Sequence, residues 1–124
     1  NRSQIIETKN NALILDAYNA NPSSMSAMLY SFSKQNYQNK LCILGDMLEM
    51  GKSSLEEHQA IINLAEELKL ECIFIGKKFS KVNENAYTNT DEFSKYLEKN
   101  SINNNTILLK GSRGIALEKL VDLL

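Results

Sequence analysis

The sequence predicts an α/β domain with a Rossmann-like, three-layer architecture. We expect a mainly parallel sheet of about six strands, with one antiparallel edge strand and helices on both faces. Short apolar runs alternate with segments of helical periodicity, and only three residues separate the first two runs. Alternation of this kind implies right-handed crossovers between parallel strands. A three-residue connection, in contrast, joins antiparallel neighbours.

Composition limits the function classes. The 124 residues are 43% hydrophobic and carry a net charge of −1, as expected for one domain, residues 1–124. No basic face indicates a nucleic-acid partner, and no apolar run approaches the roughly 20 residues of a membrane span. Cys42 and Cys72 lie in apolar runs and are predicted to be buried free thiols. Free thiols favour a cytoplasmic protein. We also expect a monomer, and the start at Asn1 without Met indicates a piece of a longer protein.

The amino-terminal third predicts a hairpin followed by a helix. Strands are expected at Gln4–Thr8 and Ala12–Ala17, joined by the turn Lys9–Asn11. The amphipathic helix that follows runs from Pro22 to about Gln35. Pro22 suits the first helical turn, where its missing N–H would be unpaired in any case, and Asn21 is then the expected N-cap.

The remaining elements follow the same alternation. Helices are expected from a capping box at Ser53–Glu56 to about Lys69, from a Thr90 cap through Asp91–Lys99, and after Ser112 to the end of the sequence. The last of these should bury Ile115, Leu117, Leu120, Val121 and Leu124. Strands are expected at Leu41–Leu44, Cys72–Ile75, Ala86–Thr88 and Thr106–Lys110.

The turn after the second expected strand is the first candidate binding site. Asp16, Tyr18, Asn19 and Asn21 place one acid, one phenol and two amides between a strand's carboxyl end and a helix's amino end. Ligands of open α/β sheets bind at such positions. The alternative is that Asn19 and Asn21 only turn the chain and cap the helix.

The segment Gly45–Ser53 follows a strand, opens a helix and ends in Gly-Lys-Ser, as a phosphate-binding loop does. However, five residues separate Gly45 from Gly51 where that loop has four, and Met47, Leu48 and Met50 are too bulky. We interpret the segment as unrelated to a phosphate loop. Asp46 is compatible either with binding a hydroxyl, an ammonium or a metal-bound water, or with a structural role as an acid at a helix start.

Lys110-Gly111-Ser112-Arg113-Gly114 joins the last expected strand to the last expected helix. Its cations and the free N–H groups of a helix start favour an anion site, and the alternative is a solvated basic pair. His58 is interpreted as a structural histidine that bonds a nearby loop, in preference to a general base.

Three motifs together resemble a known family. Asp16-Ala17-Tyr18-Asn19-Ala20-Asn21-Pro22, Leu44-Gly45-Asp46-Met47-Leu48-Glu49-Met50-Gly51 with His58, and Lys110-Gly111-Ser112-Arg113-Gly114 are similar to the carboxyl-terminal domain of the Mur ligases. The first two motifs resemble the members that add D-alanyl-D-alanine. Residues 1–4 resemble the end of the linker from the central domain.

The resemblance implies a role in cell-wall synthesis. It implies a three-domain ATP-dependent ligase that joins D-alanyl-D-alanine to UDP-N-acetylmuramoyl-tripeptide, with Mg²⁺ held by the central domain. It also implies that this domain holds no catalytic residue, swings over the active site and is inactive alone. ATP contacts are then expected from Asp16, Tyr18, Asn19 and Asn21, and dipeptide contacts from Lys110, Ser112, Arg113 and Asp46; Glu49 is a weaker candidate.

Two alternatives remain at this stage. A receiver-like regulatory module has acids at strand ends and a lysine after its last strand. However, it needs paired acids where Ala17 follows Asp16, and usually a proline where Gly111 follows Lys110. A small P-loop NTPase would need the Gly45–Ser53 segment to bind phosphate.

Overall fold

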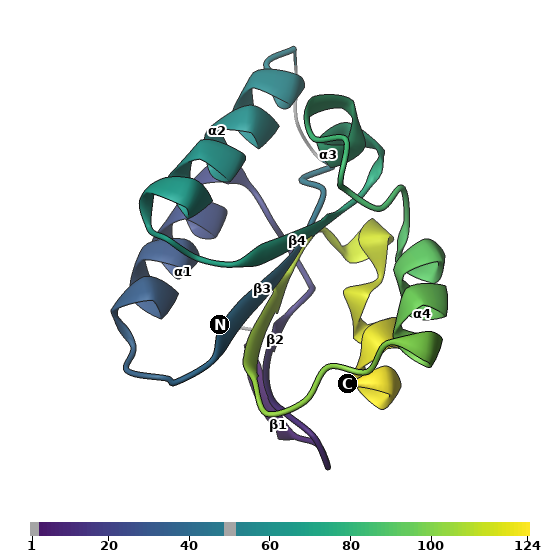
Figure 1. The fold of residues 1–124 in the computed structure, drawn as a ribbon. Coiled ribbons are helices and arrows are strands. Elements are labelled where there is room, and N and C mark those ends of the chain that lie inside the picture. The colour runs from purple at the N-terminus through teal and green to yellow at the C-terminus, as the bar shows by residue number, and fades with distance from the viewer. Residues whose placement is uncertain (1–2, 49–51) are drawn as a thin grey trace.

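The computed structural model describes residues 3–48 and 52–124 and confirms the predicted fold class. The sheet has the strand order β1-β2-β5-β3-β4 (Figure 1). β1 runs antiparallel to β2 at one edge, and β2, β5, β3 and β4 are parallel. The strands are β1 (Gln4–Glu7), β2 (Ala12–Asp16), β3 (Lys40–Gly45), β4 (Cys72–Ile75) and β5 (Thr106–Lys110).

Helical segments cover both faces of the sheet (Figure 1). One face packs against α1 (Pro22–Lys34), α2 (Ser54–Glu67) and α3 (Lys77–Val82). The other packs against α4 (Thr90–Lys99) and the 3₁₀ segments η1 (Arg113–Ile115) and η2 (Leu117–Leu123). Strand side chains alternate between the two layers, since Cys42 and Leu44 join the first core and Leu41 and Ile43 the second.

The helix starts agree only in part with the prediction. Asn21 caps α1 as expected: its Oδ1 accepts the Ser24 N–H at 2.9 Å. The predicted capping box at Ser53 is wrong, because Ser53 makes no side-chain cap bond and its φ and ψ of −88° and 15° are not extended. The predicted Thr90 cap is also wrong. Asn89 caps α4, whereas the Thr90 hydroxyl donates to the Ile115 carbonyl at 2.6 Å.

Three other elements differ from the prediction. The strand expected at residues 86–88 is only an isolated bridge between Ile75 and Tyr87, because the chain turns into the Asn89 cap directly afterwards. The helix expected after Ser112 is replaced by η1 and η2, since Ala116 between them adopts a left-handed φ of 62°. Leu117, Leu120 and Leu124 are buried as predicted, while Ile115 and Val121 are half-buried. The short helix α3 was not predicted.

Both cysteines are free, as predicted, with Cys42 buried and Cys72 half-buried. They stand directly opposite one another on β3 and β4. A hydrogen bond with the Cys72 thiol, followed by burial, raises the pKa of Cys42 above its usual range, so Cys42 stays a neutral thiol. Among the described helices, none combines the length and the apolar character needed to cross a bilayer.

Candidate functional site

Three loops meet at the carboxyl edge of the sheet, one each after β2, β5 and β3. They meet because these strands are parallel neighbours, with β5 between the other two. Gly45 and Gly111 allow the close approach: a Cβ on Gly111 would lie 2.8 Å from the Gly45 Cα. The sheet therefore brings all three sequence motifs to one place.

A largely buried ion pair joins the first and third motifs. Asp16 and Lys110 are register partners on β2 and β5, and the Lys110 Nζ lies 2.8 Å from the Asp16 Oδ2. Lys110 is 2% exposed and also donates to the Asn19 carbonyl at 3.2 Å. Lys110 therefore fixes the loop after β2 against β5. Asp16 and Lys110, which were predicted for two different ligands, contact each other.

Ser112 joins all three loops. Its N–H donates to the Asp46 carbonyl at 2.9 Å, and its Oγ accepts the Leu48 N–H at 2.8 Å and donates to the Ala20 carbonyl at 3.4 Å. Ser112 is buried, and its hydroxyl is used within the protein. The side chain therefore positions the neighbouring backbone.

The carboxylate of Asp46 bonds the first turn of α3, a helix distant in sequence. Its two carboxylate oxygens accept the N–H groups of Lys78 at 2.8 Å and Phe79 at 2.9 Å, and the residue is 1% exposed. Gly76 permits this contact, because its φ is +137° and a Cβ there would lie 2.1–2.4 Å from the carboxyl atoms of Asp46. Of the two roles considered for Asp46, the geometry matches the acid at a helix start.

His58 has a structural role, as predicted. Its Nε2 accepts the Met47 N–H at 3.0 Å, and its Nδ1 lies 2.6 Å from the Ser54 carbonyl, which can only accept. These bonds assign the proton to Nδ1 and leave the ring neutral. The 3.8 Å separation between the His58 Nε2 and the Asp46 Oδ1 is therefore not a charged pair. His58 is fully buried and holds the loop after β3 on α2.

Tyr18 and Arg113 are exposed side chains in the accessible part of the site. The Arg113 guanidinium carbon lies 5.3 Å from the centroid of the Tyr18 ring, within cation–π range. Both residues border a depression of about 300 Å³, which we call the central depression. Within the described chain, Arg113 forms no ion pair with Glu118 or Asp46. The central depression is lined by Tyr18, Asn19, Leu48, Ser112, Arg113 and Gly114.

The remaining predicted residues have different placements. Asn19 lines the central depression, whereas the Asn21 side chain caps α1. Glu49 and part of the segment Gly45–Ser53 lie outside the described residues. Within residues 3–48 and 52–124, no group of three potential metal ligands is found.

The sequence did not predict several residues that line depressions at this edge of the sheet. Leu48 packs on Gly114, since a Cβ on Gly114 would lie 2.8 Å from a Leu48 methyl carbon. A second depression of about 390 Å³ is lined by Lys77, Lys78 and Lys81 and shares Leu48 and Gly114 with the first. The only signal in the sequence was the Lys-Lys pair directly after Gly76.

Comparison with known proteins identifies relatives along nearly the whole chain. A family model described as "Mur ligase, glutamate ligase domain" matches residues 1–113. The UDP-N-acetylmuramoyl-tripeptide–D-alanyl-D-alanine ligase of Rickettsia prowazekii is 32% identical over 98% of this chain. The chain spans only 29% of that relative's length.

Solved structures of related ligases contain a domain with the same fold as this chain. A crystal structure of MurF from Acinetobacter baumannii has a TM-score of 0.79 and 32% identity, and the match covers 97% of this chain and 29% of that one. A second structure from A. baumannii, a UDP-N-acetylmuramoylalanyl-D-glutamyl-2,6-diaminopimelate–D-alanyl-D-alanyl ligase, has a TM-score of 0.77 and 30% identity and covers 97% and 28%. MurF from Thermotoga maritima in complex with ADP shares the fold, with a TM-score of 0.70, 20% identity, and coverage of 96% and 29%.

Proposed function

The chain belongs to the Mur ligase family, and from that premise we propose that it is the carboxyl-terminal domain of a UDP-N-acetylmuramoyl-tripeptide–D-alanyl-D-alanine ligase. The full protein would act in peptidoglycan synthesis in the cytoplasm and use ATP. ADP bound to the T. maritima relative supports the choice of nucleotide. We propose that Mg²⁺ is held by parts of the ligase outside this chain.

The proposed reaction has two steps. The terminal carboxylate of the nucleotide-linked peptide attacks the γ-phosphorus of ATP, which gives an acyl phosphate and releases ADP. The amine of the dipeptide then attacks the acyl carbon, inorganic phosphate leaves, and the new amide nitrogen loses a proton. The described residues of this chain would bind and orient the substrates, an effect that alone can lower a barrier by several kcal/mol, roughly 7–11 at the limit.

One observation carries the proposal: the sheet brings all three family motifs to a single edge. Asp16 and Lys110 are joined at 2.8 Å, and Ser112 links the loops after β2 and β3. The nucleotide-side and dipeptide-side residues therefore belong to one rigid surface. Movement of the domain would carry both sets towards the rest of the ligase together.

On this surface we assign contact roles to the accessible residues. Tyr18 and Asn19 would contact the nucleotide, together with the part of the Asp16 carboxylate that Lys110 does not use. Arg113 would hold the dipeptide carboxylate, since a guanidinium forms a planar, permanently charged fork. We assign Lys110, Ser112 and Asp46 to positioning, because their side chains bond other parts of the domain.

The peptide substrates would be anionic. The dipeptide has one free carboxylate. The substrate name of the A. baumannii relative includes D-glutamyl and 2,6-diaminopimelate units, which carry further carboxylates. We propose that this chain serves a substrate of the same anionic class.

The test uses the full-length protein that contains this chain. Phosphate release should require ATP, the nucleotide-linked peptide and D-alanyl-D-alanine together, and mass spectrometry should detect the ligated product. Chain 1–124 alone should give no turnover above a mock preparation. Activity with the dipeptide omitted, or turnover by the isolated chain, would contradict the proposal.

A further inference from the structure

The second depression lies beside the central one at the same edge of the sheet. It is enclosed by α3, the start of α4 and the Gly114–Ile115 segment. The two depressions share Leu48 and Gly114, whose contact separates them. A ligand in the central depression therefore needs to extend only past this contact to reach the second one, which we call the lysine groove.

Positive charge dominates the lysine groove. Lys77 and Lys81 are exposed and one helical turn apart, and Lys78 is half-buried. Within the described residues, none of the three forms an ion pair. Three lysines in a concave surface, without an acidic partner among the described residues, favour an anionic ligand.

Among the described residues, the acids near the groove, including Asp46 in its lining, form no ion pair with its lysines. Both oxygens of Asp46 accept backbone N–H groups of α3. Glu92, in the first turn of α4, accepts the Thr88 N–H at 2.6 Å through Oε1. Asp91, also in that turn, is exposed and does not line the groove. None of these three described acids is therefore paired with an ammonium group of the groove.

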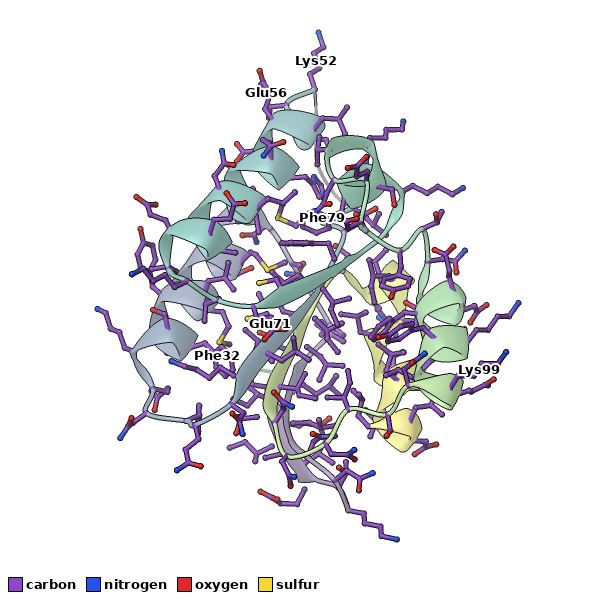
Figure 2. All side chains as sticks on the ribbon, in the orientation of Figure 1. Phe32, Lys52, Glu56, Glu71, Phe79 and Lys99 are labelled. Atoms are coloured by element: carbon purple, nitrogen blue, oxygen red, sulfur yellow. The ribbon has the colours of Figure 1, made fainter. Side chains whose placement is uncertain are left out.

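The groove is also held rigidly. Asp46 fixes the start of α3 to the end of β3, and Phe79 is fully buried with its ring centroid 4.6 Å from that of His58. Figure 2 shows Phe79 directed inward between α3 and the sheet. Because the helix does not have to be ordered on binding, less of the binding free energy is lost.

We propose that the lysine groove binds a carboxylate of a peptide substrate whose reacting end lies in the central depression. The inference rests on the proposed function and extends it, because the Arg113 assignment accounts for only one carboxylate. The carboxylate belongs to the nucleotide-linked peptide, because the dipeptide has one free carboxylate and Arg113 is assigned to it. A lysine ammonium is a compact charge without the planar geometry of a guanidinium, so it can bind a carboxylate in several orientations.

The decisive experiment compares two double variants of the full-length ligase. Lys77→Ala/Lys81→Ala removes two charges from the groove, and Lys95→Ala/Lys119→Ala removes two exposed charges that line neither depression. Both should melt at the parent's temperature, since all four side chains are exposed. The groove variant should raise the KM of the nucleotide-linked peptide by about 10-fold, as expected for the loss of a charged contact. The KM of ATP should not change.

The affected substrate identifies the source of the carboxylate. A raised KM for the nucleotide-linked peptide alone supports the inference, whereas a raised KM for D-alanyl-D-alanine alone would contradict it. Unchanged peptide KM values, or equal effects in both double variants, would overturn the inference.

A binding measurement separates this inference from the proposed function. Each peptide substrate is added to the parent protein before brief lysine acetylation, and the modified sites are located by mass spectrometry. The nucleotide-linked peptide should protect Lys77 and Lys81 but not Lys95 or Lys119, and D-alanyl-D-alanine should protect none of the four. If the unsubstituted enzyme ligates its substrates but neither lysine is protected, the inference about the lysine groove is refuted and the proposed function is not. A parent that does not ligate would refute the proposed function, while the protection pattern would still test the groove.

Discussion

The buried and the exposed residues of the candidate site are built differently. The internal set, Asp46, Lys110 and Ser112, is 1%, 2% and 6% exposed, and every member bonds another loop or helix. Tyr18, in contrast, is 48% exposed, and Arg113 lies over its ring at the mouth of the central depression. Both sets come from the same short motifs.

This difference separates two tasks within one motif. Removal of a buried polar side chain lowers stability, because the group that it bonded is left unpaired away from water. An exposed cation at a depression costs little stability when removed, but a bound anion loses a contact. Loss of an internal residue should therefore appear in unfolding measurements, and loss of an exposed one in kinetics.

The largest expected effect is that of Lys110→Met. The substitution keeps most of the side-chain length but leaves the Asp16 carboxylate, whose side chain is 14% exposed, without its cation. Breaking a buried ion pair from one side costs about 3–5 kcal/mol. Chemical denaturation of the variant should show a loss of this size.

A double variant provides the control for Lys110. Asp16→Asn/Lys110→Met removes both charges, so its loss of unfolding free energy should be smaller than the sum of the two single losses. A Lys110→Met protein with the parent's stability and a defect only towards dipeptide would place Lys110 in the exposed set, and the division would fail.

The sequence predicted the features that depend on local pattern. The apolar runs, the hairpin and the Asn21 cap are all encoded within a few residues, and the structure contains them. The motifs also pointed to the carboxyl edge of the sheet, where strand order then brought them together.

What the sequence could not predict depends on distant partners. The first turn of the short helix α3 donates to the carboxylate of Asp46, which lies 32 residues before Lys78 in the chain. Thr90 is not the cap because its hydroxyl bonds Ile115, 25 residues away. The contact between Asp16 and Lys110 likewise depends on β2 and β5 being neighbours, so residues predicted to bind two ligands bond each other.

Arg113→Ala is expected to have the next largest effect, and on kinetics. The kcat/KM for the dipeptide should fall by roughly 10- to 100-fold, which corresponds to about 1.4–3 kcal/mol of charged hydrogen bonding. Unfolding should not change measurably, because the side chain is exposed and its described contact is the Tyr18 ring. Steady-state assays with varied dipeptide test this result.

Arg113→Lys is the matched variant and should recover only part of the activity, since an ammonium cannot form the bidentate contact. An unaltered dipeptide kcat/KM in a stably folded Arg113→Ala enzyme would remove Arg113 from the site. A fall in stability that affected ATP and dipeptide equally would move it to the internal set.

The smallest expected effect is that of Lys52→Ala, which tests whether exposure alone makes a cation functional. Lys52 is exposed and lies in the Gly-Lys-Ser sequence before α2, but it lines neither the central depression nor the lysine groove. Figure 2 shows its side chain directed away from the body of the domain. A lysine of a true phosphate loop contacts the transferred phosphate directly, so its loss would greatly reduce the rate. We expect instead that kcat/KM for ATP and for dipeptide stay within about two-fold of the parent, as for a surface change within about 0.5 kcal/mol.

Arg113→Ala serves as the positive control in the same assay. If Lys52→Ala abolished turnover while the protein stayed folded, the Gly45–Ser53 segment would have to bind phosphate, and position at the two depressions would no longer distinguish functional cations from solvated ones.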